Sequence, residues 1–204
     1  IGLAFVIIAL ARPRWGEVYT EVFQRSREVI IAIDLSKSML AEDIKPNRLE
    51  RAKLVLESLL DNLQGESVGL VVFAGTAFLQ SPMSPDYQIL RGFLKDLNPD
   101  FIPQGGTNYD AMLETALDSF RQSDSQADRF LIVISDGESL DNSWSQHIEA
   151  LKAQNARAIC LGFGTTDGGL NPDGQGRNHK DSTGAVVLTQ LVAETLKSLA
   201  THPG

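Results

Sequence analysis

Four short apolar runs alternate with longer amphipathic segments along the chain, and this order restricts the fold more than any other feature. The runs lie at 28–34, 68–73, 130–135 and 157–163, and continuous apolar runs of this length are typical of strands buried on both faces. Strands that alternate with helices form a parallel sheet with helices on both sides. The sequence therefore predicts a doubly wound α/β fold in one domain.

The segments between the runs carry apolar residues at helical spacing. Asn47 is typical of a helix cap, with Glu50 three residues later, and Gly65 is typical of a helix stop. Four further helices are expected, at 86–97, 108–120, 145–154 and 193–200. These helices are expected to cover both faces of the sheet.

Two segments depart from the simple alternation. Gly75 turns the chain toward Ala77-Phe78-Leu79, which predicts a short antiparallel strand at one edge of an otherwise parallel sheet. The Gly- and Asp-rich stretch from Gly164 to Asp181 has no periodicity and is expected to be a long loop or an irregular hairpin. A last short strand is expected at Val186–Leu188.

Composition limits the classes of function. The chain has 204 residues, of which 43% are hydrophobic and 22% charged, a globular balance. Its 18 Lys and Arg are scattered among 26 Asp and Glu, for a formal charge of −8. Nucleic acid is therefore not an expected partner, because phosphate binding needs clustered cations. The one cysteine, Cys160, lies in a strand-like run and is expected to be a buried structural thiol.

Oxygen-bearing side chains follow the predicted strands. Asp34, Ser36 and Ser38 alternate after the first run, so in an extended chain their side chains point the same way. Thr107 follows a glycine pair, and Asp136 follows the third run. Ligands in such sheets bind outside the carboxyl ends of the strands. Five oxygen donors without nitrogen or sulfur favour a hard cation, Mg²⁺ or Mn²⁺, with an exchangeable position that an incoming carboxylate could fill.

Each part of this pattern also has a simpler interpretation. A D-x-S-x-S match arises by chance in on the order of a few per cent of chains of this length. Thr107 could cap the following helix, with Asp110 completing a capping box. Asp136-Gly137 could be only the turn after a strand. The coincidence of all parts at the ends of buried strands favours the metal site.

The first residues, Ile1 to Ala11, are uncharged and apolar. Eleven residues are too few to span a bilayer, which needs about 20. Three interpretations stay open from composition: the end of a membrane helix, the end of a secretory signal cleaved after Ala11, or a core helix.

The pattern of these motifs resembles the von Willebrand factor A domain and its metal-ion-dependent adhesion site. The resemblance covers nearly the whole chain and implies a Rossmann-like fold. It assigns the metal ligands to Asp34, Ser36 and Ser38 in the first segment, Thr107 in the second and Asp136 in the third. At Lys37 the sequence has a cation where glycine is usual, which leaves the ligand set complete but adds a positive charge beside it.

A narrower resemblance is carried by "ALARPRWGEV", "MLAEDIKPNRLERAK", "GLVVFAGTAFLQSPMSPDY", "IPQGGTN" and "KDSTGAVVLTQL". These stretches are similar to the membrane-anchored bacterial Bat-type (aerotolerance-associated) proteins. The likeness implies that residues 1–14 are the end of a membrane helix with its flank and that 15–204 form the A domain. It implies an inner-membrane protein with the domain in the periplasm, although Arg12 and Arg14 mildly favour a cytoplasmic flank. It also implies partners: a MoxR-type AAA+ ATPase and other Bat proteins.

We expect a non-enzymatic, cation-dependent protein-binding module whose partner supplies an acidic residue to the metal. A Mg²⁺-dependent phosphoryl-transfer enzyme is the alternative, but the residue two after Asp34 is Ser36 rather than an acid, and no G-x-x-x-x-G-K-[ST] loop is present. A third reading is a structural A domain whose metal only ties loops together. Zinc hydrolysis is not expected, because the three histidines lack H-E-x-x-H spacing.

Overall fold

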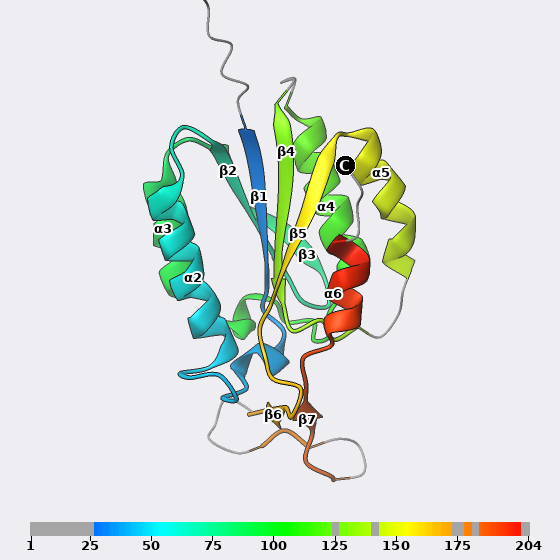
Figure 1. Cartoon of the computed structure of the whole chain (residues 1–204). Helices are drawn as coiled ribbons and strands as arrows, with labels where there is room; N and C mark the ends of the chain where they lie inside the picture. The colour runs from blue at the N-terminus through cyan, green and yellow to red at the C-terminus, as the bar shows by residue number, and fades with distance from the viewer. Residues whose placement is uncertain (1–26, 124–126, 140–142, 173–177, 181–183, 201–204) are drawn as a thin grey trace, which may run out of the picture.

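A five-stranded sheet forms the centre of the molecule in the computed structural model, which describes residues 27–123, 127–139, 143–172, 178–180 and 184–200 (Figure 1). The strand order is β3-β2-β1-β4-β5, and only β3 is antiparallel to its neighbour. The strands are β1 (Arg27–Asp34), β2 (Ser67–Phe73), β3 (Ala77–Ser84), β4 (Asp128–Ser135) and β5 (Ala156–Gly162).

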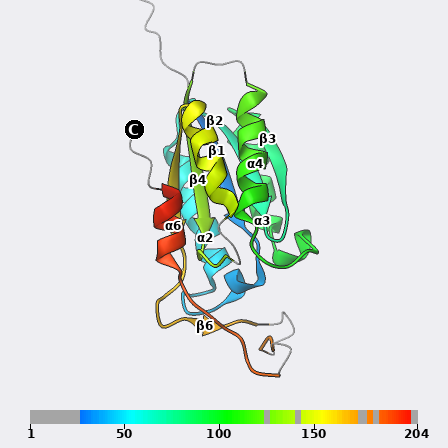
Figure 2. The same ribbon diagram turned by 90° about the vertical axis from the view of Figure 1, so that its right-hand side faces the viewer.

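Helices cover both faces of this sheet. They are α2 (Arg48–Asn62), α3 (Tyr87–Asp96), α4 (Tyr109–Arg121), α5 (His147–Ala153) and α6 (Ala193–Ala200), with short 3-10 turns η1 (Lys37–Leu40), η2 (Pro99–Phe101) and η3 (Ser143–Gln146). Helices α2 and α3 lie on one face, α4 and α5 lie on the other, and α6 packs beside β5 (Figures 1 and 2). The expected doubly wound α/β fold is therefore confirmed.

Each sheet face has its own hydrophobic cluster, because successive side chains of a buried strand point to opposite sides. Ile31 and Ile33 of β1 pack with the apolar stripe of α2, whereas Ile30 and Ala32 pack with that of α4. All four β1 side chains are fully buried. This central strand delivers Asp34 to the edge of both clusters.

The expected helix starts are confirmed where a capping residue is present. The side chain of Asn47 accepts a hydrogen bond from the Glu50 N–H at 2.8 Å, as a cap does. Asn108, not Thr107, caps α4, because its side chain accepts from the Ala111 N–H at 2.9 Å. The capping interpretation of Thr107 is therefore wrong.

Three element boundaries differ from expectation. Strand β3 continues to Ser84 rather than Leu79, because it pairs along most of β2. The helix expected at 145–154 is a 3-10 turn followed by α5, which begins at His147. The long loop contains an irregular hairpin, in which β6 (Gly169–Leu170) pairs with β7 (Leu188–Thr189), so the last strand starts at Leu188 rather than Val186.

The expected membrane segment, residues 1–14, lies outside the described residues. Across the part of the chain that is described, no helix is both long and apolar enough to cross a membrane. Cys160 is partly rather than fully buried, and burial raises the pKa of its thiol to about 12.

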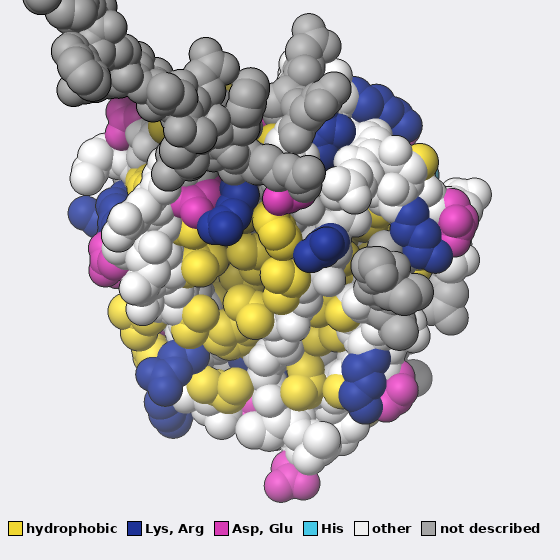
Figure 3. Space-filling model, turned by 45° about the horizontal axis from the view of Figure 1, so that its top comes forward, with side chains coloured by type: hydrophobic (Ala, Val, Ile, Leu, Met, Phe, Trp, Pro, Cys, Tyr) yellow, Lys and Arg dark blue, Asp and Glu magenta, His cyan; other side chains and the backbone are white. Residues whose placement is uncertain are grey.

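Hydrophobic side chains gather on the side of the molecule where β4 and β5 face the viewer in Figure 1, with Lys and Arg around them (Figure 3). Ile159 of β5 is 44% exposed and lies next to Ile132 of β4 across the parallel pair. This patch is distinct from the strand ends that carry the predicted ligands, which lie at the lower end of the sheet in Figure 1.

Candidate metal centre

Two aspartates stand at the carboxyl ends of neighbouring parallel strands. Asp34 is the last residue of β1, and Asp136 directly follows β4. Both side chains are fully buried. Because β1 and β4 are paired in parallel register up to Ile33 and Ile134, their ends meet at the same edge of the sheet. The structure thus brings together two residues that lie about 100 positions apart in the sequence.

Asp34 is held by neutral donors. Its Oδ1 accepts from the Ser36 N–H at 2.8 Å, and its Oδ2 accepts from the Ser135 hydroxyl at 2.6 Å. Since the Ser135 proton goes to Asp34, the hydroxyl of Tyr109, at 2.7 Å, donates to Ser135. Desolvation, and then the charge of Asp136, raises the pKa of Asp34 to about 7. When Asp34 is ionised, neither of its hydrogen-bond donors carries a positive charge that would compensate it.

The two serines converge, but not through an extended chain. Backbone alternation ends at Ser36, and the chain then turns into η1, with Met39 N–H donating to the Ser36 carbonyl at 3.0 Å. The Ser36 and Ser38 hydroxyl oxygens still lie 2.9 Å apart, and both residues are buried. The two hydroxyls therefore lie side by side, although the extended geometry assumed for them is wrong.

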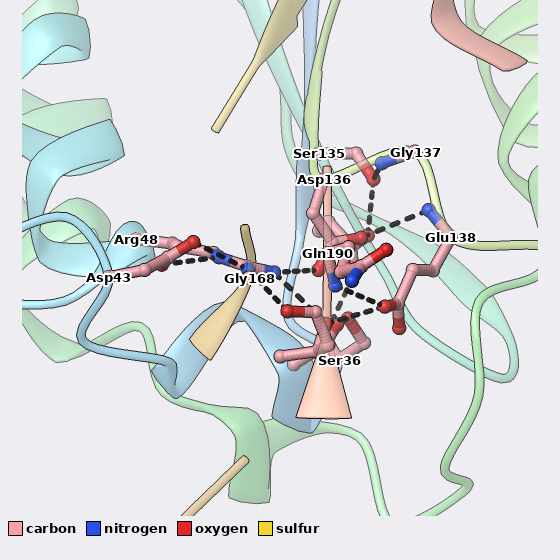
Figure 4. A network of polar contacts seen from close by, with 12 residues as sticks. Ser36, Asp43, Arg48, Ser135, Asp136, Gly137, Glu138, Gly168 and Gln190 are labelled. Carbon is pink, nitrogen blue, oxygen red and sulfur yellow. Dashed lines mark hydrogen bonds and ion pairs between the residues drawn. The ribbon is translucent and has the colours of Figure 1, made fainter. Parts of the chain in front are cut away.

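Asp136 is held by charged and backbone donors. Its Oδ2 accepts from Arg48 Nη1 at 2.9 Å, and its Oδ1 accepts from the Glu138 N–H at 3.1 Å (Figure 4). Desolvation raises the pKa of Asp136, and hydrogen bonding from Ser38 opposes that rise. Gly137 makes the turn possible, because its φ is +82° and an added Cβ would lie 2.2 Å from the Val192 carbonyl oxygen.

Arg48 is the charged partner that the sequence interpretation missed. It is the first residue of α2, and its side chain is fully buried. Besides Asp136, it binds Asp43 through two hydrogen bonds of 2.8 Å each. Burial alone would raise the pKa of Asp43, but hydrogen bonds from Arg48 and Thr165 lower it to about 2. The available signal was the helix dipole rule, since an arginine in a first turn is unfavourable without an anionic partner.

Thr189 and Glu138 extend the same polar network to the β6–β7 hairpin. Arg48 Nη1 donates to the Thr189 hydroxyl at 3.0 Å, and Nη2 donates to its carbonyl at 3.1 Å. The Thr189 hydroxyl donates to Glu138 at 2.6 Å, and the Gln190 N–H donates to the same carboxylate oxygen at 2.9 Å. The hairpin is thereby fixed against the strand ends (Figure 4).

Thr107 lies apart from the other four predicted ligands in its contacts. Among the described residues, no hydrogen bond joins its side chain to theirs. It lines a cavity of about 360 Å³ together with Glu138, Val192 and Thr195. Its loop is anchored on one side, where the Asn108 N–H donates to the Ala74 carbonyl at 2.7 Å. The preceding Gly106 has a φ of +99°, a backbone conformation that favours glycine.

The donor set suits a hard divalent cation. The cluster offers two buried carboxylates and two hydroxyls 2.9 Å apart, with no nitrogen or sulfur side chain among them. Within the described ranges, no group of three or more His, Cys, Asp or Glu is arranged to hold a metal, so hydroxyl oxygens would have to complete the coordination. The charge of Asp136 raises the pKa of the neighbouring Asp34, so a cation between the two carboxylates would relieve this repulsion.

The fold and these strand ends define a class of protein. Residues 29–138, more than half of the chain, match the family model of the von Willebrand factor type A domain. The chain belongs to this family, whose domains are generally protein-interaction modules.

The particular relatives are bacterial. BatB from Bacteroides thetaiotaomicron is a solved structure with 35% identity and a TM-score of 0.81, covering 86% of this chain and 85% of that chain. An aerotolerance-related membrane protein from Bacteroides fragilis also has 35% identity, with a TM-score of 0.80, covering 86% and 87%. A UPF0353 protein of Mycolicibacterium paratuberculosis is 30% identical over 86% of this chain. The chain spans about half the length of that curated relative, 55%. The resemblance to Bat-type proteins is confirmed.

Two more distant solved structures share the fold and were obtained with metals. Proximal thread matrix protein 1 from the mussel byssus has a zinc-occupied metal-ion-dependent adhesion motif, with 18% identity, a TM-score of 0.64 and coverage of 86% of this chain and 41% of that chain. The Plasmodium vivax TRAP protein is manganese-loaded, with 14% identity, a TM-score of 0.62 and coverage of 88% and 64%. A divalent metal is thus present in some proteins of this fold.

Proposed function

We propose that this chain is a divalent-cation-dependent protein-binding module without enzymatic activity. The observation that carries the proposal is the meeting of Asp34, Ser36, Ser38 and Asp136 at the ends of β1 and β4. Asp34, Ser36 and Ser38 would hold the cation, Mg²⁺ or Mn²⁺, with Asp136 and Thr107 completing the site. When bound, the cation would supply a coordination position for a carboxylate of the partner protein.

The surroundings of Thr107 support a partner that approaches from this end of the molecule. The cavity of about 360 Å³ that Thr107 lines is bordered by Val192, which is 38% exposed. A partner segment with an acidic residue beside an apolar one matches a cation next to this cavity. The negative formal charge of the chain, −8, disfavours an acidic partner at long range, so the cation would have to provide the attraction locally.

The cellular setting is proposed from the relatives. The B. fragilis structure with 35% identity is that of a membrane protein, and residues 1–11 are uncharged and apolar. We place the chain at the inner membrane, with residues 1–14 as the end of a membrane helix, residues 15–204 as the A domain, and the domain in the periplasm. A MoxR-type AAA+ ATPase and other Bat proteins are the proposed partners.

Capture of membrane proteins on the immobilised chain tests the proposal. Binding is expected in excess Mg²⁺ and is expected to be lost in EDTA and with the Asp34→Ala variant. Partner capture that persists in EDTA would reject the cation dependence. Thermal unfolding in EDTA is the companion measurement, since a metal that only ties loops together would change stability without changing capture.

Thr107→Ala separates the metal from the partner. Thr107 lines the cavity and makes no hydrogen bond to the other predicted ligands among the described residues. We therefore expect the variant to weaken partner capture more than Mn²⁺ binding. Thr195→Ala, which alters the same cavity without removing a predicted ligand, is the matched control. Unchanged partner capture by Thr107→Ala would leave Thr107 outside the partner site.

A further inference from the structure

Arg48 is fully buried, and its guanidinium donates a hydrogen bond to Asp136, a predicted cation ligand. Its side chain makes five hydrogen bonds, to Asp43, Asp136 and Thr189. The two to Asp43 are bidentate, so Nη1 is left for Asp136 and the Thr189 hydroxyl. Figure 4 shows the guanidinium between the two aspartates.

The local sequence does not account for a cation at this place. Arg48 occupies the first position of α2, where the helix dipole disfavours positive charge. It also packs against the loop after β5, since an added Cβ at Gly164 would lie 3.1 Å from its Cζ and Nε atoms. Asp43 accepts two of the five hydrogen bonds of the guanidinium and already compensates its charge. The pairing of the same guanidinium with Asp136 therefore places a positive charge beside a second carboxylate.

We propose that Arg48 is the built-in counter-charge of the metal centre. The guanidinium compensates the charge of Asp136, while Asp34 carries the charge that a cation must meet. This inference rests on the proposed metal site and deepens it. It makes the site asymmetric: Asp34 has neutral partners, whereas Asp136 has a permanent positive one.

The proposal has a consequence opposite to that of a purely structural ion pair. A fixed positive charge one hydrogen bond away from a ligand carboxylate opposes the binding of a cation. Its removal should leave the folded site more negative and tighten cation binding, even though the metal-free protein becomes less stable. If Arg48 only held the fold together, its removal would leave metal affinity unchanged or weaken it.

The test is Mn²⁺ titration calorimetry on wild type and Arg48→Met, together with thermal unfolding in EDTA and in excess Mn²⁺. We expect the Mn²⁺ dissociation constant of Arg48→Met to fall by about tenfold or more. We also expect a lower unfolding temperature in EDTA and a larger upward shift on adding Mn²⁺ than in wild type. Arg48→Gln, which keeps a hydrogen-bond donor, carries the same expectations if Arg48→Met does not fold.

Two further variants separate charge from shape. Arg48→Lys keeps the charge and loses the fork, so its Mn²⁺ affinity should stay within about threefold of wild type. Arg129→Met is the matched control, because Arg129 is also largely buried and pairs with Glu28 at 3.1 Å, at the other end of the sheet. It should lose stability without a change in Mn²⁺ affinity.

Each outcome decides one of the two proposals. If wild type binds Mn²⁺ and both uncharged Arg48 variants bind it with equal or weaker affinity, the counter-charge role is overturned and the metal site is retained. Equal tightening in Arg129→Met also overturns it, because the effect would then belong to the net charge of the protein. A wild-type protein that binds no Mn²⁺ overturns the metal site and the role of Arg48 together.

Discussion

Asp34 and Asp136 occupy equivalent places at the ends of β1 and β4, and both are fully buried. Their surroundings differ in charge. Asp34 receives hydrogen bonds from a serine hydroxyl and a backbone amide, whereas Asp136 receives one from a guanidinium. Asp136 therefore has a positively charged partner within the protein, whereas the hydrogen-bond donors of Asp34 are neutral, and in the proposed function a bound cation would supply the missing positive charge.

The largest effect on Mn²⁺ binding is expected from substituting Asp34, which has no positively charged partner. Asp34→Ala should weaken Mn²⁺ binding by about a hundredfold or more, because it deletes the carboxylate that has no cationic partner. The fold should survive, since the deleted group is repelled by Asp136 in the metal-free protein. Calorimetry and circular dichroism check the two parts. Wild-type Mn²⁺ affinity in a folded Asp34→Ala protein would contradict the metal assignment.

Substituting Asp136, which is paired with Arg48, should act mainly on stability. Asp136→Ala leaves Arg48 buried with Asp43 as its remaining charged partner, and we expect the free energy of unfolding to fall by about 3 kcal/mol in EDTA. Urea denaturation measures this value. Asp34→Ala under the same conditions is the control and should lose clearly less. Equal losses for the two variants would remove the contrast between the carboxylates.

The pH dependence of stability should report Asp34. Its pKa is raised from 3.8 to about 7 in the folded protein, so between these values the folded state binds a proton that the unfolded state has lost. The stability of the metal-free protein should therefore decrease as the pH rises from about 4 through about 7. Denaturation in EDTA from pH 5 to 8 tests this trend. Asp34→Asn should flatten it, and an equally steep trend in that variant would assign it to another group.

Asp43 should change the stability with pH in the opposite direction, and at lower pH. Its pKa is lowered from 3.8 to about 2, so its contribution to stability is present above pH 3.8 and is lost as the pH falls toward 2. Asp43→Asn should have a shallower acid transition than wild type between pH 4 and 2. Arg48→Lys, which retains a cation beside Asp43, should keep the steeper transition.

The smallest effect is expected from substituting Tyr109, whose hydroxyl is linked to Asp34 through Ser135. Tyr109→Phe removes the hydroxyl that donates to Ser135 but keeps the ring packed against Phe73 and Trp144. We expect a loss of about 1 kcal/mol in unfolding free energy and less than about a threefold change in Mn²⁺ affinity. A loss of affinity as large as that of Asp34→Ala would mean that the neutral partners of Asp34 set the metal site.

The sequence predicted the sheet and the strand-end cluster because both follow from local rules. Buried strands have recognisable apolar runs, and the carboxyl ends of parallel strands meet at one edge, which placed Asp34 near Asp136. The contacts of Arg48 with Asp136 and Thr189 join residues 88 and 141 positions away. No spacing rule connects such residues, so they became visible only in the structure. The 3-10 turn after Ser36 was missed for a different reason: its hydrogen bonds are local, but the extended geometry of the strand was assumed to continue as far as Ser38.

The central claim is that a divalent cation binds between the ends of β1 and β4. The most direct measurement is the broadening of backbone amide resonances by Mn²⁺ in the folded protein, with calorimetry for the stoichiometry. We predict one ion per chain and broadening that is strongest around Asp34, Ser36, Ser38 and Asp136 and absent in Asp34→Ala. No saturable broadening, or broadening centred on other acidic residues, would contradict the claim.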